Sequence, residues 1–224
     1  MNMRAAFFLI FLNSMPTMLG ADLSDLTYKL SAGRIKITAC KQTATGTLVI
    51  PDTIEGTAVT TIDSGAFVSC PLLTGVTFPE SLTEIRANAF VLCTGLTSLD
   101  IPDGVTTLGE NCFLNCSGLT TVSTGNGVTV IPAKAFEGST SLASISLGNS
   151  ISAISSRAFS FCTNLDNLVI PDNITTIGPH AFWQCAGLTT LTLGNGLTSI
   201  GVEAFEECTS LTSVELSERV IVIE

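Results

Sequence analysis

Six of the eight cysteines in this 224-residue chain recur at one fixed spacing, and aligned thiols can form disulfides or bind zinc. They are Cys70, Cys93, Cys116, Cys162, Cys185 and Cys208, and Ser139 fills the one gap in the series. Equivalent residues of stacked repeats should lie about 4.8 Å apart, whereas bridged cysteines have Cβ atoms about 3.8 Å apart. A straight column also lacks the tetrahedral convergence that zinc needs. We therefore predict buried free thiols; the states of Cys40 and Cys112, outside the column, stay open.

A second column could present carboxylate oxygens, which are ligands for Ca²⁺. Its members are Asp52, Glu80, Asp103, Asn126, Asn149, Asp172, Asn195 and Glu218. Neutral asparagines interrupt the carboxylates, and the tendency of Asp and Asn to bond nearby backbone in turns explains both residue types. We predict no metal and no cofactor.

The only histidine, His180, is the remaining candidate for catalysis. A nucleophilic triad needs a Ser or Cys and a carboxylate beside the imidazole. Equivalent positions in other repeats hold Asn88, Asn111, Lys134 and Glu203, which indicates a solvent-facing repeat position. We expect no enzyme. The alternative, a secreted β-solenoid enzyme acting on polysaccharide, would need charged residues clustered on neighbouring repeats.

The elements that position these residues follow a 23-residue period. Leucines mark it at Leu73, Leu96, Leu119, Leu142, Leu165, Leu188 and Leu211. In the repeat 96–118, alternating residues predict a strand near its start, Pro102-Asp103-Gly104 predicts a turn, and a second extended piece follows. The stretch before Phe113 suits one brief helical turn. The period predicts a leucine-rich-repeat solenoid, mostly β, with stacked phenylalanines as its spine.

Strand residues that alternate with the buried positions form the candidate ligand-binding face. They are Thr97, Ser98, Asp100, Thr120, Thr121, Ser144, Asn167, Thr189, Thr190 and Thr192. Trp183 is added because a lone exposed tryptophan can anchor a partner. Two alternatives remain open: this face is merely solvated, and Trp183 merely packs along a ridge.

The repeat resembles the BspA-type leucine-rich repeat. The resemblance rests on Ile101-Pro102-Asp103, Ile170-Pro171-Asp172, Gly65-Ala66-Phe67, Asn88-Ala89-Phe90 and Glu203-Ala204-Phe205. It covers about residues 46–224, with mild departures at Phe78, Cys112 and Ser139. The resemblance implies surface or secreted proteins with roles in adhesion and cell aggregation, and it supplies no catalytic residues.

Three segments are expected along the chain. Residues 1–21, with Arg4 before an apolar run, are typical of a cleaved signal peptide, and the run is too short to span a membrane. Residues 22–45 predict a capping hairpin, and 46–224 about seven rungs plus a partial last one. The apolar end at 220–223 leaves an open edge, which indicates either a truncated chain or self-association through that edge.

Composition limits the partners. The net charge is −10 and only 12% of residues are charged, which excludes a basic nucleic-acid surface. We expect a secreted or cell-surface module, non-catalytic, that binds an extracellular protein or glycan without membrane insertion. A purely structural spacer is the further alternative.

Overall fold

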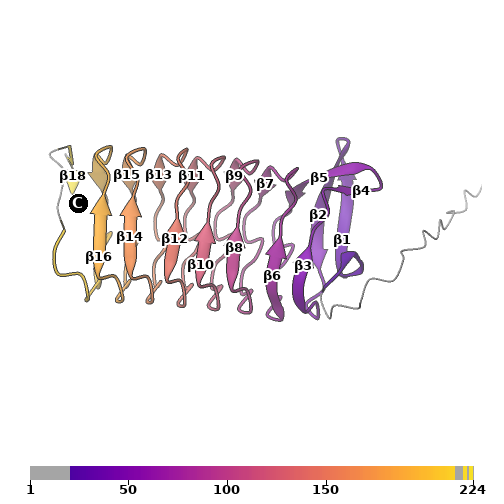
Figure 1. Ribbon diagram of the computed structural model, residues 1–224, viewed down its shortest axis with the longest axis horizontal. Coiled ribbons are helices and arrows are strands. Elements are labelled where there is room, and N and C mark those ends of the chain that lie inside the picture. The colour runs from indigo at the N-terminus through magenta and orange to yellow at the C-terminus, as the bar shows by residue number, and fades with distance from the viewer. Residues whose placement is uncertain (1–20, 215–218, 221, 224) are drawn as a thin grey trace, which may run out of the picture.

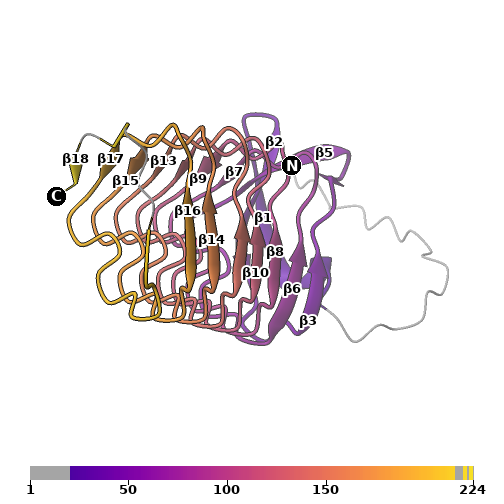
Figure 2. The ribbon, with the colours of Figure 1, turned by 60° about the vertical axis from the view of Figure 1, so that its left-hand side comes forward.

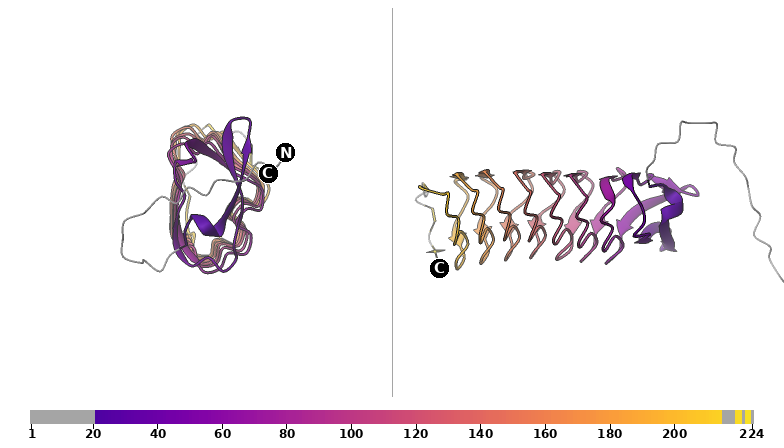
Figure 3. Two further views of the ribbon diagram at one scale, coloured as in Figure 1. Left: turned by 90° about the vertical axis from the view of Figure 1, so that its right-hand side faces the viewer. Right: turned by 90° about the horizontal axis from the view of Figure 1, so that it is seen from below.

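The computed structural model describes residues 21–214, 219–220 and 222–223. Apart from the short 3₁₀ helix η1 (Leu23–Asp25), every assigned element in these residues is a strand. The rungs stack side by side into an elongated tube (Figure 1), and seen from its end they superpose as an oblong ring (Figure 3). The predicted leucine-rich-repeat solenoid is therefore confirmed.

One side of the tube carries the strand that opens each rung (Figure 1). These strands are β3 (Gly46–Val49), β6 (Leu73–Thr77), β8 (Ser98–Asp100), β10 (Thr121–Ser123), β12 (Ser144–Ser146), β14 (Asn167–Ile170) and β16 (Thr190–Leu193). They pair in parallel as β3–β6, β8–β10–β12 and β14–β16. Thr121 lies between Ser98 and Ser144, so one rung of register equals one 23-residue period. We call the outward surface of these seven strands the strand face.

A second set of strands forms another side of the tube (Figure 2). They are β5 (Thr57–Ile62), β7 (Glu84–Ile85), β9 (Thr107–Leu108), β11 (Val130–Ile131), β13 (Ala153–Ile154), β15 (Thr176–Ile177), β17 (Ser199–Ile200) and β18 (Val222–Ile223). They form two parallel groups, β5–β7–β9 and β11–β13–β15–β17–β18. Each of these strands beyond β5 has only two residues, because the chain must turn again to close the rung.

The segment around each phenylalanine is not the brief helical turn that the sequence suggested. It forms consecutive turns with left-handed backbone at two positions of every rung. The first position is Gly65, Asn88, Asn111, Lys134, Arg157, His180 and Glu203, and the second is Ser69, Leu92, Asn115, Gly138, Phe161, Gln184 and Glu207. Alternate amides then donate within the rung, as Val91 does to Asn88, and to the next rung, as Phe90 does to Cys112. Stacking thus satisfies the backbone groups that a helical turn would have paired locally.

Two of the turn glycines lie against the backbone of the neighbouring rung. Gly104 and Gly196 do not have positive φ; instead, the neighbouring rung lies against them. A Cβ built on Gly196 would lie 1.8 Å from the carbonyl oxygen of Asp172. Close approach of stacked backbones, rather than left-handed geometry, therefore requires glycine there.

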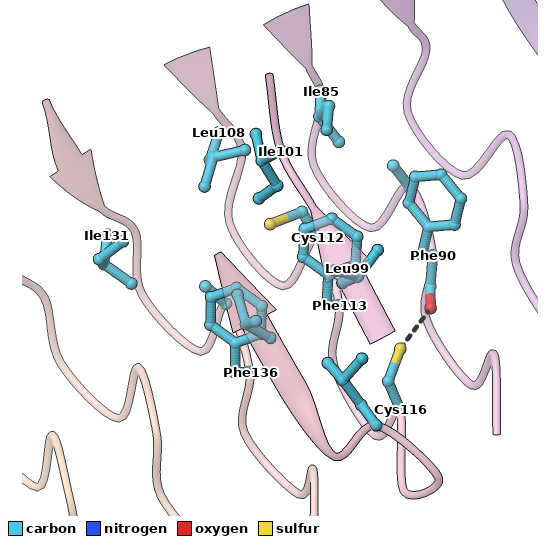
Figure 4. Packing of buried hydrophobic residues seen from close by; sticks show 14 of the residues in the cluster. Ile85, Phe90, Leu99, Ile101, Leu108, Cys112, Phe113, Cys116, Ile131 and Phe136 are labelled. Carbon is cyan, nitrogen blue, oxygen red and sulfur yellow. Dashed lines mark hydrogen bonds between the residues drawn. The ribbon is translucent and has the colours of Figure 1, made fainter. Parts of the chain in front are cut away.

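The core is a continuous apolar column inside the tube (Figure 4). Its spine is the series Phe67, Phe90, Phe113, Phe136, Phe159, Phe182 and Phe205, as predicted. Successive ring centroids are 4.5 to 5.3 Å apart and the rings are within 17° of parallel. The first six rings are fully buried. Each ring is thus packed mainly by the rungs on either side of it.

A hairpin covers the N-terminal end of the tube. β1 (Leu26–Ser31) pairs antiparallel with β2 (Arg34–Cys40), and β2 pairs in parallel with β5. β4 (Thr53–Ile54) folds back antiparallel on β5 through the extra residues of the first rung. The unpaired edge of the first rung is therefore covered, which stacked repeats require at their ends.

Two expectations concern the ends of the chain. The predicted signal peptide falls on residues 1–20, outside the described residues, and only Ala21 of it is described. The predicted open edge falls partly on residues 215–218, 221 and 224, which are also outside. Among the described residues, no helix is both long enough and apolar enough to cross a bilayer.

Candidate functional site

All ten predicted strand residues are exposed on the strand face, on or next to its strands. They belong to five of its seven strands, β8, β10, β12, β14 and β16. Their hydroxyl, amide and carboxylate groups differ in one respect that exposure does not reveal. Some are already hydrogen-bonded to the neighbouring rung, whereas others have no protein partner.

Threonines just before the strands are committed to the fold. The Thr97 hydroxyl donates to the carbonyl of Thr74 at 3.1 Å, and the Thr120 hydroxyl donates to the carbonyl of Thr97 at 2.8 Å. The Thr189 hydroxyl donates to Asp166, reaching its carboxylate at 2.5 Å. Each hydroxyl proton is therefore used in joining two rungs, and only the oxygen lone pairs remain for a ligand.

Over β14 and β16, Asn167 and Thr190 are engaged in the same way, whereas the exposed Thr192 makes no side-chain hydrogen bond within the described residues. The Thr190 hydroxyl donates to the side-chain oxygen of Asn167, whose amide donates to the Asp166 carboxylate at 2.9 Å. Val169, two residues after Asn167 on β14, is 62% exposed and offers no polar side-chain group. A ligand at Asn167 or Thr190 would have to compete with hydrogen bonds that already exist.

The face over β8, β10 and β12 is different. Within the described part of the chain, no protein hydrogen bond engages the side chains of Ser98, Asp100, Thr121 and Ser144 or those of Ser123 and Ser146. These short side chains line an open hollow of about 590 Å³, floored by Leu99, Val122 and Ile145. Exposed hydroxyls without protein partners can both donate to and accept from a ligand.

Two further hollows adjoin this one. One of about 420 Å³ extends past Asp100 and Ser123 toward the turns at Asp103 and Asn126. Another of about 480 Å³ extends from Ser98 toward β6, reaching Thr74 and Glu80. Asp100 lines all three hollows, so they form one polar depression around its carboxylate. None of the described residues that line it is basic.

The predicted site list lacked several residues of this depression. Glu80 and Asp103 belong to turns, and in the sequence they were grouped with the turn column rather than with the strands. Thr74 and Thr77 come from the earlier β6 and line the same hollow as Ser98. The 23-residue register could have identified these residues. Equivalent turn and strand positions of successive repeats lie beside one another, so residues near Ser98 and Asp100 in that register should line the same surface.

The acidic column is held by hydrogen bonds between rungs. The Asp103 carboxylate accepts from the backbone amide of Asn126 at 2.7 Å, and that of Asp172 accepts from the amide of Asn195 at 2.6 Å. The turn role that we predicted for these side chains is therefore confirmed, but the expected partner was wrong. The Asp103 and Asp172 carboxylates accept from the turn of the next rung, not from their own turn. Over the described residues, no cluster of three His, Cys, Asp or Glu side chains is arranged to hold a metal ion.

Trp183 lies away from the strand face, in the turn segment that follows β15. Its ring packs edge-on against Phe161 at 4.8 Å between centroids, and the Arg157 guanidinium lies 5.9 Å from its centroid. The alternative interpretation, packing along a ridge, describes it better than a strand-face anchor. His180 is half-buried rather than solvent-facing, with its Nδ1 3.1 Å from Glu203.

The column cysteines are free thiols engaged in one repeated contact. Beyond Cys70, each Sγ donates to the carbonyl of the phenylalanine one rung earlier, as Cys116 does to Phe90 at 3.2 Å (Figure 4). The same contact recurs from Cys93, Cys162, Cys185 and Cys208 at 3.0 to 3.4 Å. Burial raises the pKa of the Cys93 thiol to about 12. The Cys93 thiol therefore joins the packing as a neutral donor.

The repeat geometry has counterparts among known proteins. A profile of the BspA type leucine rich repeat region, with six repeat copies, matches residues 33–162 and 129–224. The chain belongs to the BspA-type leucine-rich repeat family. No curated protein matches it.

Two solved structures of leucine-rich repeat proteins extend this comparison. One from Eubacterium ventriosum shares 25% identity at a TM-score of 0.73, over 85% of this chain and 52% of that one. The T. pallidum protein TpLRR shares 26% identity at a TM-score of 0.58, over 85% of this chain and 89% of that one. The chain thus spans about half the length of the Eubacterium ventriosum protein. Family and fold are those of repeat modules, a class built for interaction through extended surfaces.

Proposed function

We propose that this chain is a secreted or cell-surface binding module whose site is the polar depression over β8, β10 and β12. The observation that carries the proposal is the set of hydroxyls without protein partners around the Asp100 carboxylate. The hydroxyls of Thr97, Thr120, Thr189 and Thr190, by contrast, are used to join rungs. The family supports an interaction role, and the predicted signal peptide supports export.

The chemistry of the depression favours a partner rich in hydrogen-bond donors. Its carboxylates come from Glu80, Asp100 and Asp103, and the whole chain carries a net charge of −10. Complementary charge steers association and selects partners. An extracellular protein surface bearing Lys and Arg fits these groups, whereas an acidic glycan would be repelled. The proposed partner is therefore a basic segment of an extracellular protein.

A binding screen with matched variants tests the proposal. The chain is presented to arrays of extracellular proteins and glycans, and hits are measured by interferometry at low and physiological salt. Thr121→Lys should abolish binding by placing a long cation in the centre of the depression. Thr107→Lys is the control, since Thr107 is also an exposed strand threonine but lies on β9.

Asp100→Asn keeps the shape of the side chain and removes its charge. We expect it to weaken binding about tenfold and to reduce the salt dependence. Equal losses from Thr121→Lys and Thr107→Lys would move the site away from the strand face. Binding to acidic glycans alone would contradict the proposed partner class.

A further inference from the structure

Cys40 and Cys70 are the two cysteines at the boundary between the capping hairpin and the first rung. We propose that they are an oxidisable pair that closes a disulfide between the capping hairpin and the first rung. The pair is independent of what the strand face binds. It would act in the oxidising environment that export, as proposed above, would provide.

The two sulfurs converge on one backbone atom. Cys40 ends β2, and its Sγ donates to the carbonyl oxygen of Lys41 at 3.6 Å. Cys70 begins the cysteine column, and its Sγ lies 3.8 Å from the same oxygen. Both thiols therefore lie within hydrogen-bonding distance of the same carbonyl oxygen. The backbone amide of Cys40 donates to Ala66 at 2.7 Å, which ties this part of the cap to the rung that carries Cys70.

Cys70 departs from the rule of its column because no rung precedes it. Cys93 donates to Phe67 and Cys116 to Phe90, in each case to the rung before. The equivalent partner for Cys70 would come from the cap, where Cys40 and Lys41 now stand. The hairpin therefore supplies the Lys41 carbonyl in that place, and it also brings the Cys40 sulfur to the same oxygen.

Accessibility also separates this pair from the rest. Cys40 is the one half-exposed cysteine, and the other seven are buried. An external reagent can thus reach the Cys40 sulfur before it reaches the buried Cys70 sulfur.

The reaction is two successive thiol–disulfide exchanges with a small-molecule disulfide as oxidant. The Cys40 thiolate attacks one sulfur of the reagent, forming a mixed disulfide and releasing one small thiol. The Cys70 thiolate then attacks Sγ of Cys40 and releases the second small thiol. Two protein thiols are oxidised by two electrons, one reagent disulfide is reduced to two thiols, and the two protons end on the released thiols.

The bond would hold the cap on the solenoid. It would link β2 to the first rung, next to the parallel contact that β2 already makes with β5. Constraining the unfolded chain at this point stabilises the folded state. The expected effect is a rise in the melting temperature by several degrees that reductant reverses.

Peptide mapping tests the proposal on the purified full chain. The protein is incubated with glutathione disulfide at pH 8, alkylated in denaturant without reductant, and digested with trypsin. Cleavage after Lys36, Lys41 and Arg86 places Cys40 in 37–41 and Cys70 in 42–86, each with no other cysteine. We expect these two peptides to be joined, and to separate on reduction.

Three variants define the outcomes. Cys40→Ser should abolish both the crosslink and the reversible rise in melting temperature, and it leaves the buried column intact. Cys70→Ser should trap the glutathione adduct on Cys40. Cys112→Ala, which restores the alanine of other rungs, should leave the crosslink unchanged. A wild-type chain that stops at the Cys40 adduct, or is alkylated at both sites, would overturn the proposal.

Discussion

The Sγ of Cys93 donates a 3.0 Å hydrogen bond to the backbone carbonyl of Phe67, one rung earlier. This contact explains why a cysteine recurs at a buried position without forming a bridge. The thiol fills a small apolar space and donates to a carbonyl of the neighbouring rung. The Cβ–S bond is longer than the Cβ–O bond of serine, so the sulfur reaches that carbonyl where a hydroxyl oxygen would not. The column therefore adds directional contacts to the packing between rungs.

Ser139 shows what happens when the sulfur is replaced by oxygen. Its Oγ is fully buried in the same column and has no hydrogen-bond partner. A buried unsatisfied hydroxyl costs about 1–3 kcal/mol, so Ser139→Cys should raise the free energy of unfolding by about 1–2 kcal/mol. Urea unfolding monitored by circular dichroism measures it. The reciprocal Cys162→Ser should lower the free energy of unfolding by a similar amount. A lower stability of Ser139→Cys would refute the idea that the thiol contacts stabilise the stacking of rungs.

Phe136 lies in the middle of the aromatic spine, with ring centroids 5.3 Å away on both sides. Phe136→Ala leaves a cavity that the flanking rungs cannot fill, and we expect a loss of about 3–5 kcal/mol. Phe205→Ala is the matched control, because Phe205 is only half-buried at the end of the stacked series. It should lose less. Equal losses at both positions would show that stacking does not govern the stability of the spine.

Gly148 tests the close approach of turn backbones. A Cβ at this position would lie 1.7 Å from the carbonyl oxygen of Gly125. Gly148→Ala should therefore separate two rungs locally and cost about 1–3 kcal/mol, as overpacking does. Gly75→Ala is the control, since its Cβ would meet only the Thr47 side chain at 3.3 Å or more. It should be neutral, and thermal melts compare the two.

The buried thiols make stability fall at alkaline pH. Burial raises the pKa of Cys93 from 9.0 to about 12 and raises that of Cys112 further. Between pH 9 and the raised pKa, the thiol stays protonated in the folded state but is ionised in the unfolded state. The stabilisation is therefore complete below pH 9 and is lost as the pH rises toward the raised pKa. Each thiol should contribute about 1.4 kcal/mol per pH unit. Urea unfolding at pH 7.5, 9 and 10 measures the slope.

Cys112→Ala provides the control for this titration. Alanine is the usual residue at that position in other rungs, so the variant should fold normally. Its free energy of unfolding should fall less steeply than that of the wild type between pH 9 and 10. An identical slope would mean that other groups cause the alkaline loss.

The sequence by itself determined the family, the strand positions, the phenylalanine spine and the buried thiols. A strict period allows only one register of stacking, and the register fixes which side chains face inward. It also showed that Thr121 and Ser144 face outward. It could not show that the Thr120 hydroxyl is committed to the neighbouring rung while that of Thr121 is free, because both residues are exposed threonines.

Tertiary structure decided the remaining features because they depend on contacts between rungs. Left-handed backbone at Lys134, Arg157 and Glu203 has no local cause in residue type; the inter-rung hydrogen bonds impose it. The polar depression around Asp100 and the meeting of Cys40 with Cys70 join residues from different rungs or from the cap. Periodicity reports which direction a side chain faces, whereas distances across neighbouring rungs determine what it can bind.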